Sequence, residues 1–354
     1  MATRSEKLFY LLLVFIPISI FFAFFTENST LSFITAIISI IPLAQLIGYA
    51  TKEITLQTTA ATAGLLNATF GNAVELIIAI LALRRGLLET VQASLIGSII
   101  GNLLLLIGVS VFFGGLKYKE QKFNKVAVGI SSTMLIIAVV GLAIPTLFSL
   151  SVRANPIQEI IISDAVAAVL AIIYFAGLLF AFFTHKHYYD ASDEMREHHE
   201  KPTITIKRAS LILLFATLFV AFQSELLVRD IEHAALNIGL TQTFVGVVII
   251  AILANIAEKL NAIHFARENK LDVALEIGLS SAIQIALFVV PILVFVSRIF
   301  NFQFSLVFSL FEIIAMFFAV MIVNYLSADG KCNWLEGAQL ISVYLIIAIA
   351  FFFV

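Results

Sequence analysis

Residues 71–98 read GNAVELIIAILALRRGLLETVQASLIGS, and residues 254–281 read ANIAEKLNAIHFARENKLDVALEIGLSS. The two stretches align without a gap at a constant offset of 183 residues. The offset pairs Asn72 with Asn255, Glu75 with Glu258, Arg84 with Arg267 and Ser98 with Ser281. Both glutamates lie in apolar surroundings, where a carboxylate costs a few kcal/mol. Such a repeat predicts a cation site at the centre of a duplicated membrane transporter.

Composition fixes the class of protein. The chain has 354 residues, of which 61% are hydrophobic and 12% charged, and its mean hydropathy is +1.06. A soluble domain could not bury so much apolar surface, whereas a spanning helix needs about 20 apolar residues. Eleven stretches qualify, at 8–25, 31–50, 59–83, 90–113, 125–149, 159–183, 208–226, 240–266, 272–297, 305–326 and 334–354. None of these stretches shows the alternation of apolar and polar residues that is typical of a strand in a membrane β-barrel. We therefore expect an all-α polytopic membrane protein with about 11 transmembrane helices.

The basic residues predict the orientation in the membrane. With the N-terminus inside, inner segments hold fifteen of the 21 Lys and Arg residues and outer loops hold five. The positive-inside rule therefore predicts the N-terminus inside and the C-terminus outside. MATRSEK precedes an apolar run but no small-residue cleavage site follows it, so we expect a retained first helix. We expect a prokaryotic plasma membrane.

The repeat predicts two inverted halves. Five crossings separate the spans of Glu75 and Glu258, and an odd number turns the second copy over. The expected organisation is a first helix in residues 1–30, two five-helix repeats at 31–183 and 208–354, and a polar linker at 184–207. This linker holds four of the six histidines. It is either a solvated connection or a regulatory segment that senses cation or pH.

Polar side chains cluster around each glutamate. Residues three or four apart share a helix face, and this relation groups the candidate metal ligands Asn72 with Glu75, Asn255 with Glu258, Ser98 with Asn102, and Ser281 with Gln284. Carboxylate, amide and hydroxyl oxygens suit a hard cation such as Ca²⁺. Without histidine or cysteine among them, zinc or copper is not indicated. When the ion leaves, burial and mutual repulsion favour protons on the two carboxylates, so Glu75 and Glu258 are also the expected proton carriers.

A single buried glutamate is often a structural one. Other ionisable candidates are therefore weaker, either because no repeat partner exists or because they lie at span ends or off the face of the pair. They are Glu225, Glu276, Glu312, Glu336, Asp164 and His264.

Longer motifs point to a family. GLLNATFGNAVELIIAILAL at 64–83 resembles the first signature repeat of the calcium/proton antiporter (CAX) family, within the cation/calcium exchanger superfamily, and ANIAEKLNAI resembles a changed second repeat. GSIIGNLLLLIG, FFGGLKYK, SSAIQIALFVVP and NWLEGA extend the likeness over most of the chain. The resemblance implies eleven spans arranged as one plus five plus five. It also implies export of cytosolic calcium against inward protons, with Glu75 and Glu258 as alternating carriers.

The second repeat departs from the family pattern, in which Gly precedes Asn and His follows Glu. Here Ala254 and Lys259 occupy these positions. Ala254 has less backbone freedom than the glycine of the family pattern. For Lys259, beside Glu258, three alternatives are open. Its side chain snorkels to the lipid headgroups, pairs with an acid such as Glu225, or reaches the site and tunes it. The ion preference is therefore open.

The leading hypothesis is a Ca²⁺/H⁺ antiporter working by alternating access. The alternatives are an exchanger of the same fold for Na⁺, K⁺ or Mn²⁺, and a cation channel. The sequence predicts no enzyme and no cofactor. It predicts the lipid bilayer, Ca²⁺ and H⁺ as partners and no nucleic acid, and it leaves a homo-oligomer open.

Overall fold

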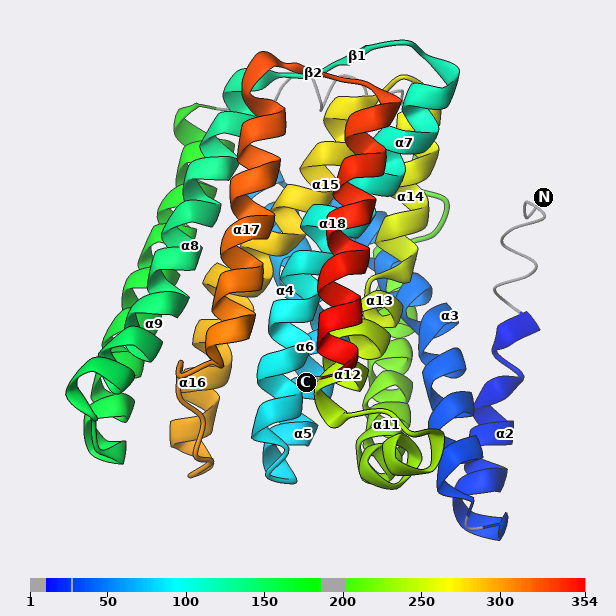
Figure 1. Cartoon of the computed structure of the whole chain (residues 1–354). Helices are drawn as coiled ribbons and strands as arrows, with labels where there is room; N and C mark the ends of the chain where they lie inside the picture. Colours follow the sequence, from blue (N-terminus) through cyan, green and yellow to red (C-terminus); the bar gives the residue numbers. More distant parts are fainter. Residues whose placement is uncertain (1–10, 27, 186–200, 354) are drawn as a thin grey trace.

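Helices that run along one common direction make up nearly all of the structure (Figure 1). The computed structural model describes residues 11–26, 28–185 and 201–353. Within these ranges eight helices are long and apolar enough to cross a membrane, or ten if each of two bent helix pairs is one span. The predicted all-α membrane fold is confirmed. The count of eleven spans is not confirmed, because within the described residues the first expected span is represented by the shorter helical stretch Phe15–Thr26.

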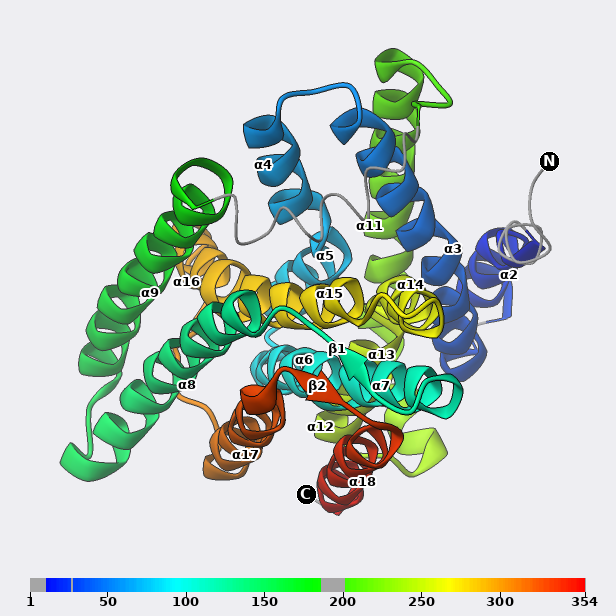
Figure 2. The ribbon, with the colours of Figure 1, turned by 90° about the horizontal axis from the view of Figure 1, so that it is seen from above.

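The first half of the chain ends in two long helices, α8 and α9. Its elements are α2 (Phe15–Phe21), η1 (Phe22–Thr26), α3 (Ser29–Thr55), α4 (Ala60–Phe70), α5 (Ala73–Arg84), α6 (Leu88–Ile100), η2 (Gly101–Leu106), α7 (Ile107–Lys117), β1 (Gln121–Lys122), α8 (Lys125–Val152), α9 (Pro156–Leu179) and η3 (Phe180–Thr184). Elements named η are π-helical, apart from the 3₁₀ turn η7. Helices α8 and α9 pack together as an antiparallel pair at one side (Figure 2).

The second half begins with the longest helix. Its elements are α11 (Ile206–Ile238), α12 (Gln242–Phe244), η5 (Val245–Ile250), α13 (Ala251–Ala254), α14 (Ile256–Arg267), α15 (Leu271–Gln284), η6 (Ile285–Val289), α16 (Val290–Ile299), α17 (Leu310–Leu326), η7 (Ser327–Asp329), β2 (Lys331–Cys332) and α18 (Trp334–Phe352). Helix α11 packs along α3. Most of the expected linker, at residues 186–200, lies outside the described residues.

Capping side chains set where several spans begin. Asn155 and Gln158 form a reciprocal capping box at α9, Ser309 and Glu312 form one at α17, and Asn333 and Glu336 form one at α18. A capping box satisfies backbone N–H groups that a helix start leaves without partners. Glu312 and Glu336 therefore have capping roles.

Two predicted boundaries are wrong. The stretch expected to be helical from residue 305 starts its helix at Leu310, because Phe304, Leu306 and Phe308 alternate into the core as an extended segment. Ser163 and Thr146 accept the backbone N–H groups of Leu306 and Phe308 at 2.9 Å each.

The helix expected to end at residue 226 continues to Ile238. Its charged residues have partners both within the helix and outside it. Asp230 accepts two bonds from Arg229, both at 2.9 Å, and Glu225 pairs with Arg85 at 2.5 Å.

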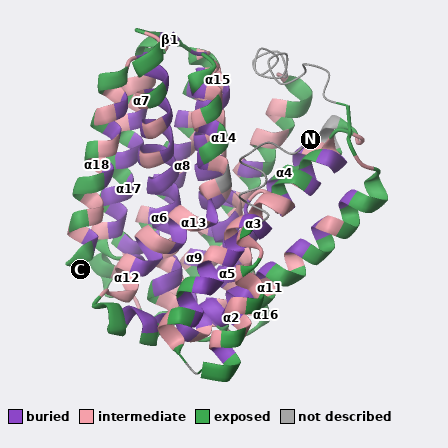
Figure 3. Ribbon diagram, turned by 90° about the vertical axis from the view of Figure 1, so that its right-hand side faces the viewer, coloured by how far each residue is buried: buried purple, intermediate pink, exposed green. Residues whose placement is uncertain are grey.

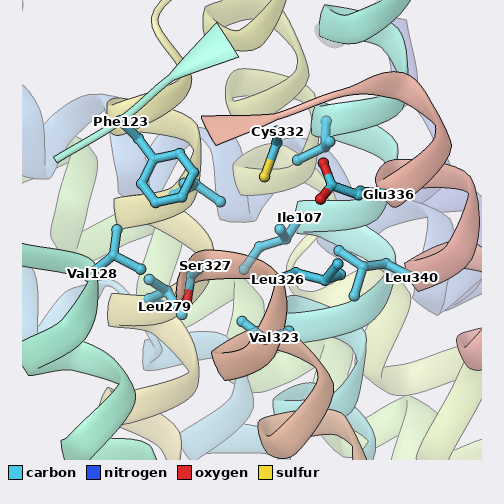
Figure 4. A pocket seen from close by; sticks show the side chains of 12 residues that line it. Ile107, Phe123, Val128, Leu279, Val323, Leu326, Ser327, Cys332, Glu336 and Leu340 are labelled. Carbon is cyan, nitrogen blue, oxygen red and sulfur yellow. The ribbon is translucent and has the colours of Figure 1, made fainter. Parts of the chain in front are cut away.

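The short strands β1 and β2 pair antiparallel across one end of the bundle, called here the strand end. They join the α7–α8 and α17–α18 connections, with Gln121 opposite Cys332 (Figure 2). Beneath them Phe123, Cys332 and Glu336 line an apolar pocket whose cavity is about 20 Å³ (Figure 4). That is room for about one water molecule. Burial raises the pKa of the Cys332 thiol to about 12, so this thiol stays protonated at neutral pH.

Burial is greatest at the centre. Figure 3 shows buried residues concentrated on α6 and α7, while exposed residues follow the outer helices. Most of the span Leu88–Lys117 is buried, and most of Trp334–Phe352 is not. Apolar residues on the outside of such a bundle suit contact with lipid. The central helices therefore hold whatever must be kept away from lipid.

Candidate cation site

Each repeat contains a helix that is broken beside its glutamate. The bend is 45° between α4 and α5, and 59° between α12–α13 and α14. Asn72 and Asn255 occupy the two breaks with closely matching backbone angles, φ −113° and ψ 26° against φ −105° and ψ 16°. Glu75 and Glu258 follow in the first turn of the second segment. A carboxylate is favourable there because the N-terminal end of a helix carries partial positive charge.

The two breaks meet across the centre of the bundle. Glu75 is buried, with 6% of its surface exposed. Its carboxylate interacts with the Asn255 side chain from the other repeat and lies close enough to Glu258 and Lys259 to sense their charges. Glu258 is half-buried and interacts with Ser281. One charged cluster thus contains both repeat glutamates.

Two further hydrogen bonds join the repeats. The Asn72 amide donates to the Gln284 Oε1 atom at 2.6 Å, and the Asn102 amide donates to the Ser281 Oγ atom at 2.8 Å. Both pairs come from elements more than 170 residues apart in the chain. These bonds place four of the predicted polar side chains beside the two glutamates.

Among the described residues, several buried oxygens of the predicted ligands have no hydrogen-bond partner. They are Asn72 Oδ1, Glu75 Oε1, Ser98 Oγ, Asn102 Oδ1 and Glu258 Oε2, each buried. A buried polar atom without a partner costs about 1–3 kcal/mol, and such atoms call for an explanation. All five are hard oxygen donors, the kind of ligand that Ca²⁺ takes in sets of six to eight. A bound cation would satisfy them together.

Backbone irregularity is also repeated. The π-helical segments η2 and η6 begin at Gly101 and Ile285, close to positions related by the 183-residue offset. Asn102 lies within η2, and Gln284 directly precedes η6. A π-helical turn shifts the face that a helix presents and is common at functional sites.

Lys259 points into the cluster. It is 7% exposed, and its ammonium donates to the Ala251 carbonyl at 3.4 Å, an oxygen that the Asn255 amide also contacts at 3.3 Å. Of the alternatives for this lysine, pairing with Glu225 is wrong, because Glu225 pairs with Arg85. The Ala251 carbonyl is a participant that the sequence did not reveal, since alanine carries no chemical signal.

The weaker candidates lie elsewhere. Asp164 pairs with Arg298 at 2.9 Å, and His264 pairs with Glu268 at 3.3 Å on an exposed surface. The sequence analysis missed Glu53, which is buried and accepts the backbone N–H groups of Thr203 and Ile204 just before α11 begins. In the described residues no three His, Cys, Asp or Glu side chains gather as a metal cluster. The cation cluster therefore depends on two carboxylates supplemented by neutral oxygens.

Fold and site together define a polytopic membrane transporter for cations, not an enzyme. Residues 28–183 and 208–353 match the family described as "Sodium/calcium exchanger protein", and the chain belongs to this family. The chain is 41% identical to a Ca(2+)/H(+) antiporter of Synechocystis over 100% of this chain and 99% of that protein. It is 41% identical to the Ca(2+)/H(+) antiporter ChaA of Bacillus subtilis over 98% of this chain and 99% of that protein. The resemblance stated above is thereby confirmed.

Solved structures agree on the fold. The structure of native YfkE superposes with a TM-score of 0.84 at 39% identity and covers 98% of this chain and 100% of that chain. The structure of an H+/Ca2+ exchanger CAX superposes with a TM-score of 0.70 at 15% identity and covers 99% of this chain and 93% of that chain. At this low identity the match supports the fold alone.

Proposed function

We propose that the chain is a secondary antiporter that exports cytosolic Ca²⁺ in exchange for H⁺. Glu75 and Glu258 bind the ion or protons alternately. The observation that carries this proposal is the meeting of both glutamates in one buried cluster, in which each carboxylate keeps an oxygen without a hydrogen-bond partner among the described residues. Relatives that are 41% identical and named Ca²⁺/H⁺ antiporters favour calcium as the cargo.

Two carboxylates in one cluster explain the exchange physically. Two negative charges attract a divalent cation, and leaving them together without one is unfavourable in a low dielectric. Protons relieve the same repulsion. Because one set of oxygens serves both cargoes, release of Ca²⁺ and uptake of H⁺ are linked at the site.

Alternating access is the proposed way of exposing this site to each side. Figure 1 shows α5 directed away from the strand end and α14 directed toward it, as inverted repeats at 31–183 and 208–354 require. The breaks at Asn72 and Asn255 provide hinge positions. From the basic-residue count we place the strand end at the cytosol, in a prokaryotic plasma membrane, with the C-terminus outside.

A second candidate is the same exchanger with another cation. Lys259 favours it, because its ammonium lies within the site and offsets part of the negative charge that a divalent ion needs. Uptake of radioactive Ca²⁺ into inverted vesicles under an imposed pH gradient tests the proposal. Uptake that collapses with the gradient supports it, and Ca²⁺ uptake that depends on Na⁺ instead would favour the second candidate.

Acid is expected to weaken Ca²⁺ binding. Protons and Ca²⁺ compete for the Glu75 and Glu258 carboxylates, so each added proton removes charge from the site. The apparent dissociation constant should rise as pH falls from about 8 to about 5.5 on the loading side. Equilibrium binding to purified protein measures this. A constant affinity over that range would contradict competition at one site.

Asn102→Ala and Gln284→Ala should weaken Ca²⁺ affinity without moving its pH dependence. Both amides lie in the cluster and neither titrates. Loss of a bond to a charged partner costs roughly 1.5–3 kcal/mol, equivalent to about a tenfold to hundredfold change. Gln92→Ala is the control, because Gln92 donates to the Val307 carbonyl at 2.7 Å, outside the cluster. A shifted pH profile with unchanged affinity would assign the amides to the proton path.

A further inference from the structure

The two helices that carry the repeat glutamates are attached to the bundle by unlike contacts at the ends remote from those glutamates. At the end of α5 the Arg85 guanidinium pairs with the Glu225 carboxylate of α11 at 2.5 Å. This contact lies at the end of the bundle opposite the strand end, called here the far end (Figure 1). At the end of α14 the Gln121 Nε2 atom of β1 donates to the Ala266 carbonyl at 2.8 Å. One attachment is therefore an ion pair, and the other is a hydrogen bond to the backbone.

The ion pair has no chemical equivalent in the second repeat. The 183-residue offset places Glu268 at the position of Arg85, and Pro42 of α3 at the position of Glu225. A proline side chain has no polar group to offer, and Glu268 binds Lys270 at 3.2 Å in the turn that follows α14. The same pair cannot form at the strand end, so this ionic contact is specific to the far end.

Glu225 depends on Arg85 for its direct ionic contact. It lies within the span Ile206–Ile238, where a carboxylate is costly unless it is paired or functional. Arg229, one turn further along α11, lies close enough to sense the charge of Glu225. Its guanidinium, however, is bound by the Asp230 carboxylate through two hydrogen bonds of 2.9 Å each. The ion pair that Glu225 itself forms therefore crosses to α5.

Helix α11 is firmly joined to α2 and α3, which lie beside it (Figure 2). The Ser19 hydroxyl of α2 donates to the Gln223 Oε1 atom at 2.7 Å, and both side chains are fully buried. At the far end the Asn237 amide donates to the Thr30 hydroxyl of α3 at 3.1 Å. The ion pair thus attaches α5, and with it Glu75, to a unit of three helices.

The internal symmetry indicates what happens to this contact in the other access state. In an inverted-repeat exchanger the two states arise when one repeat moves against the other around the site. Helix α5 then takes the environment that α14 has now. The end of α14 is bound to α7 and β1, where Lys117 donates to the Arg267 carbonyl at 3.1 Å. The offset relates α7 to α16, which α5 already contacts. By this symmetry α5 moves from α11 toward α16, and the ion pair breaks.

We propose that the Arg85–Glu225 ion pair is a latch that holds α5 against α11 in this conformation and opens once in each transport cycle. The proposal rests on the proposed alternating access. Arg85 and Glu225 are positioning residues, because they act on the ion through the placement of the helix that carries Glu75. Their side chains are 36% and 38% exposed, and ion pairs with such exposure are weak. A weak pair suits a contact that must break at every turnover.

Cross-linking tests whether the latch must open. Arg85→Cys and Glu225→Cys are combined and joined by a bis-methanethiosulfonate reagent that spans the length of the ion pair. The one native cysteine, Cys332, is buried. Ca²⁺/H⁺ exchange in proteoliposomes should stop on joining and return when a reductant cleaves the link. Thirty-fold excess of reagent is not needed for the control, in which Thr30→Cys with Asn237→Cys joins the repeats at the same end without a glutamate-bearing helix and exchange should continue. Undiminished exchange in the joined first pair, or equal inhibition of both pairs, would overturn the latch.

A distance measurement tests the latch without transport. Spin labels at Arg84→Cys and Leu236→Cys report the separation of α5 from α11 by double electron–electron resonance, and both positions are exposed. Glu225→Gln should raise the ratio of the longer to the shorter separation by about two- to fivefold, the range for a partly exposed ion pair. Glu232→Gln is the matched control, an exposed acid of α11 that binds the Gln242 amide at 3.2 Å, and it should change nothing. An unchanged distribution in Glu225→Gln would overturn the latch.

Variants of the arginine separate charge from packing. Arg85→Gln should shift the distribution as Glu225→Gln does, and the double variant should shift it no further, because each single change already breaks the pair. Arg85→Lys keeps the charge and should stay near the wild type. Additive shifts, or a lysine variant that behaves like the glutamine variant, would overturn the ion pair as the cause. If the wild type exchanges no Ca²⁺ for H⁺ while this distance pattern holds, the proposed function fails and the latch stands.

Discussion

Replacing either repeat glutamate by glutamine should abolish exchange and leave the protein folded. Glu75→Gln and Glu258→Gln keep the shape of the side chain and remove both its charge and its proton site. Charge-assisted contacts are worth roughly 1.5–3 kcal/mol each, so Ca²⁺ affinity should fall by about a hundredfold at the upper end. Coupling to protons should disappear, because an amide does not carry the transported proton. Calcium-driven proton movement in proteoliposomes measures both effects.

The matched control is Glu312→Gln. Glu312 is also a buried glutamate in a membrane helix, but it accepts the Ser309 backbone N–H at 2.9 Å as part of a capping box. Glutamine serves the same capping position, so exchange should persist. Wild-type rates in Glu75→Gln or Glu258→Gln would remove that residue from the mechanism. Loss of activity in all three variants would point to general intolerance of the substitution.

Much of the fold was predictable because the membrane imposes simple rules. Apolar length locates spanning helices, and the predicted second to eleventh spans correspond to helices or bent helix pairs. The boundary errors arise where tertiary contacts override hydropathy. The segment around Leu306 is apolar yet extended, since Ser163 and Thr146 supply its hydrogen bonds from other helices. Local sequence does not contain those partners.

The site was predictable to the extent that the repeat reveals it. Matched Asn and Glu pairs drew attention to the breaks, and the structure places them together at the centre. The cross-repeat pairing of Asn72 with Gln284 was not predictable, because their equivalents Asn255 and Gly101 cannot form the same bond. Contacts made by backbone atoms, such as the Ala251 carbonyl, could also not be predicted from the residue types.

Removing the charge of Lys259 should strengthen Ca²⁺ binding substantially. This ammonium lies inside the cluster, close to Glu75 and Glu258, and donates to the Ala251 carbonyl at 3.4 Å. When both carboxylates are ionised, the site carries one net negative charge with the ammonium and two without it. At about 5 Å and an effective dielectric near 20, a unit charge repels a divalent ion by roughly 7 kcal/mol before relaxation and solvent screening. A net gain of about 2 kcal/mol, or about thirtyfold in affinity, is a conservative expectation.

Two neutral variants separate charge from packing. Lys259→Met keeps the length and apolar stem, whereas Lys259→Gln keeps a polar end that can still contact the Ala251 carbonyl. If charge is the cause, equilibrium Ca²⁺ titration should show tighter binding in both. Tighter binding in one alone would indicate a packing or hydrogen-bond effect. Two variants with wild-type affinity, rate and pH profile would show that Lys259 does not tune the site. Tighter binding in both variants would also explain how one fold with the same pair of glutamates can differ in its preference for divalent cations. The difference would come from a lysine ammonium placed beside the two carboxylates.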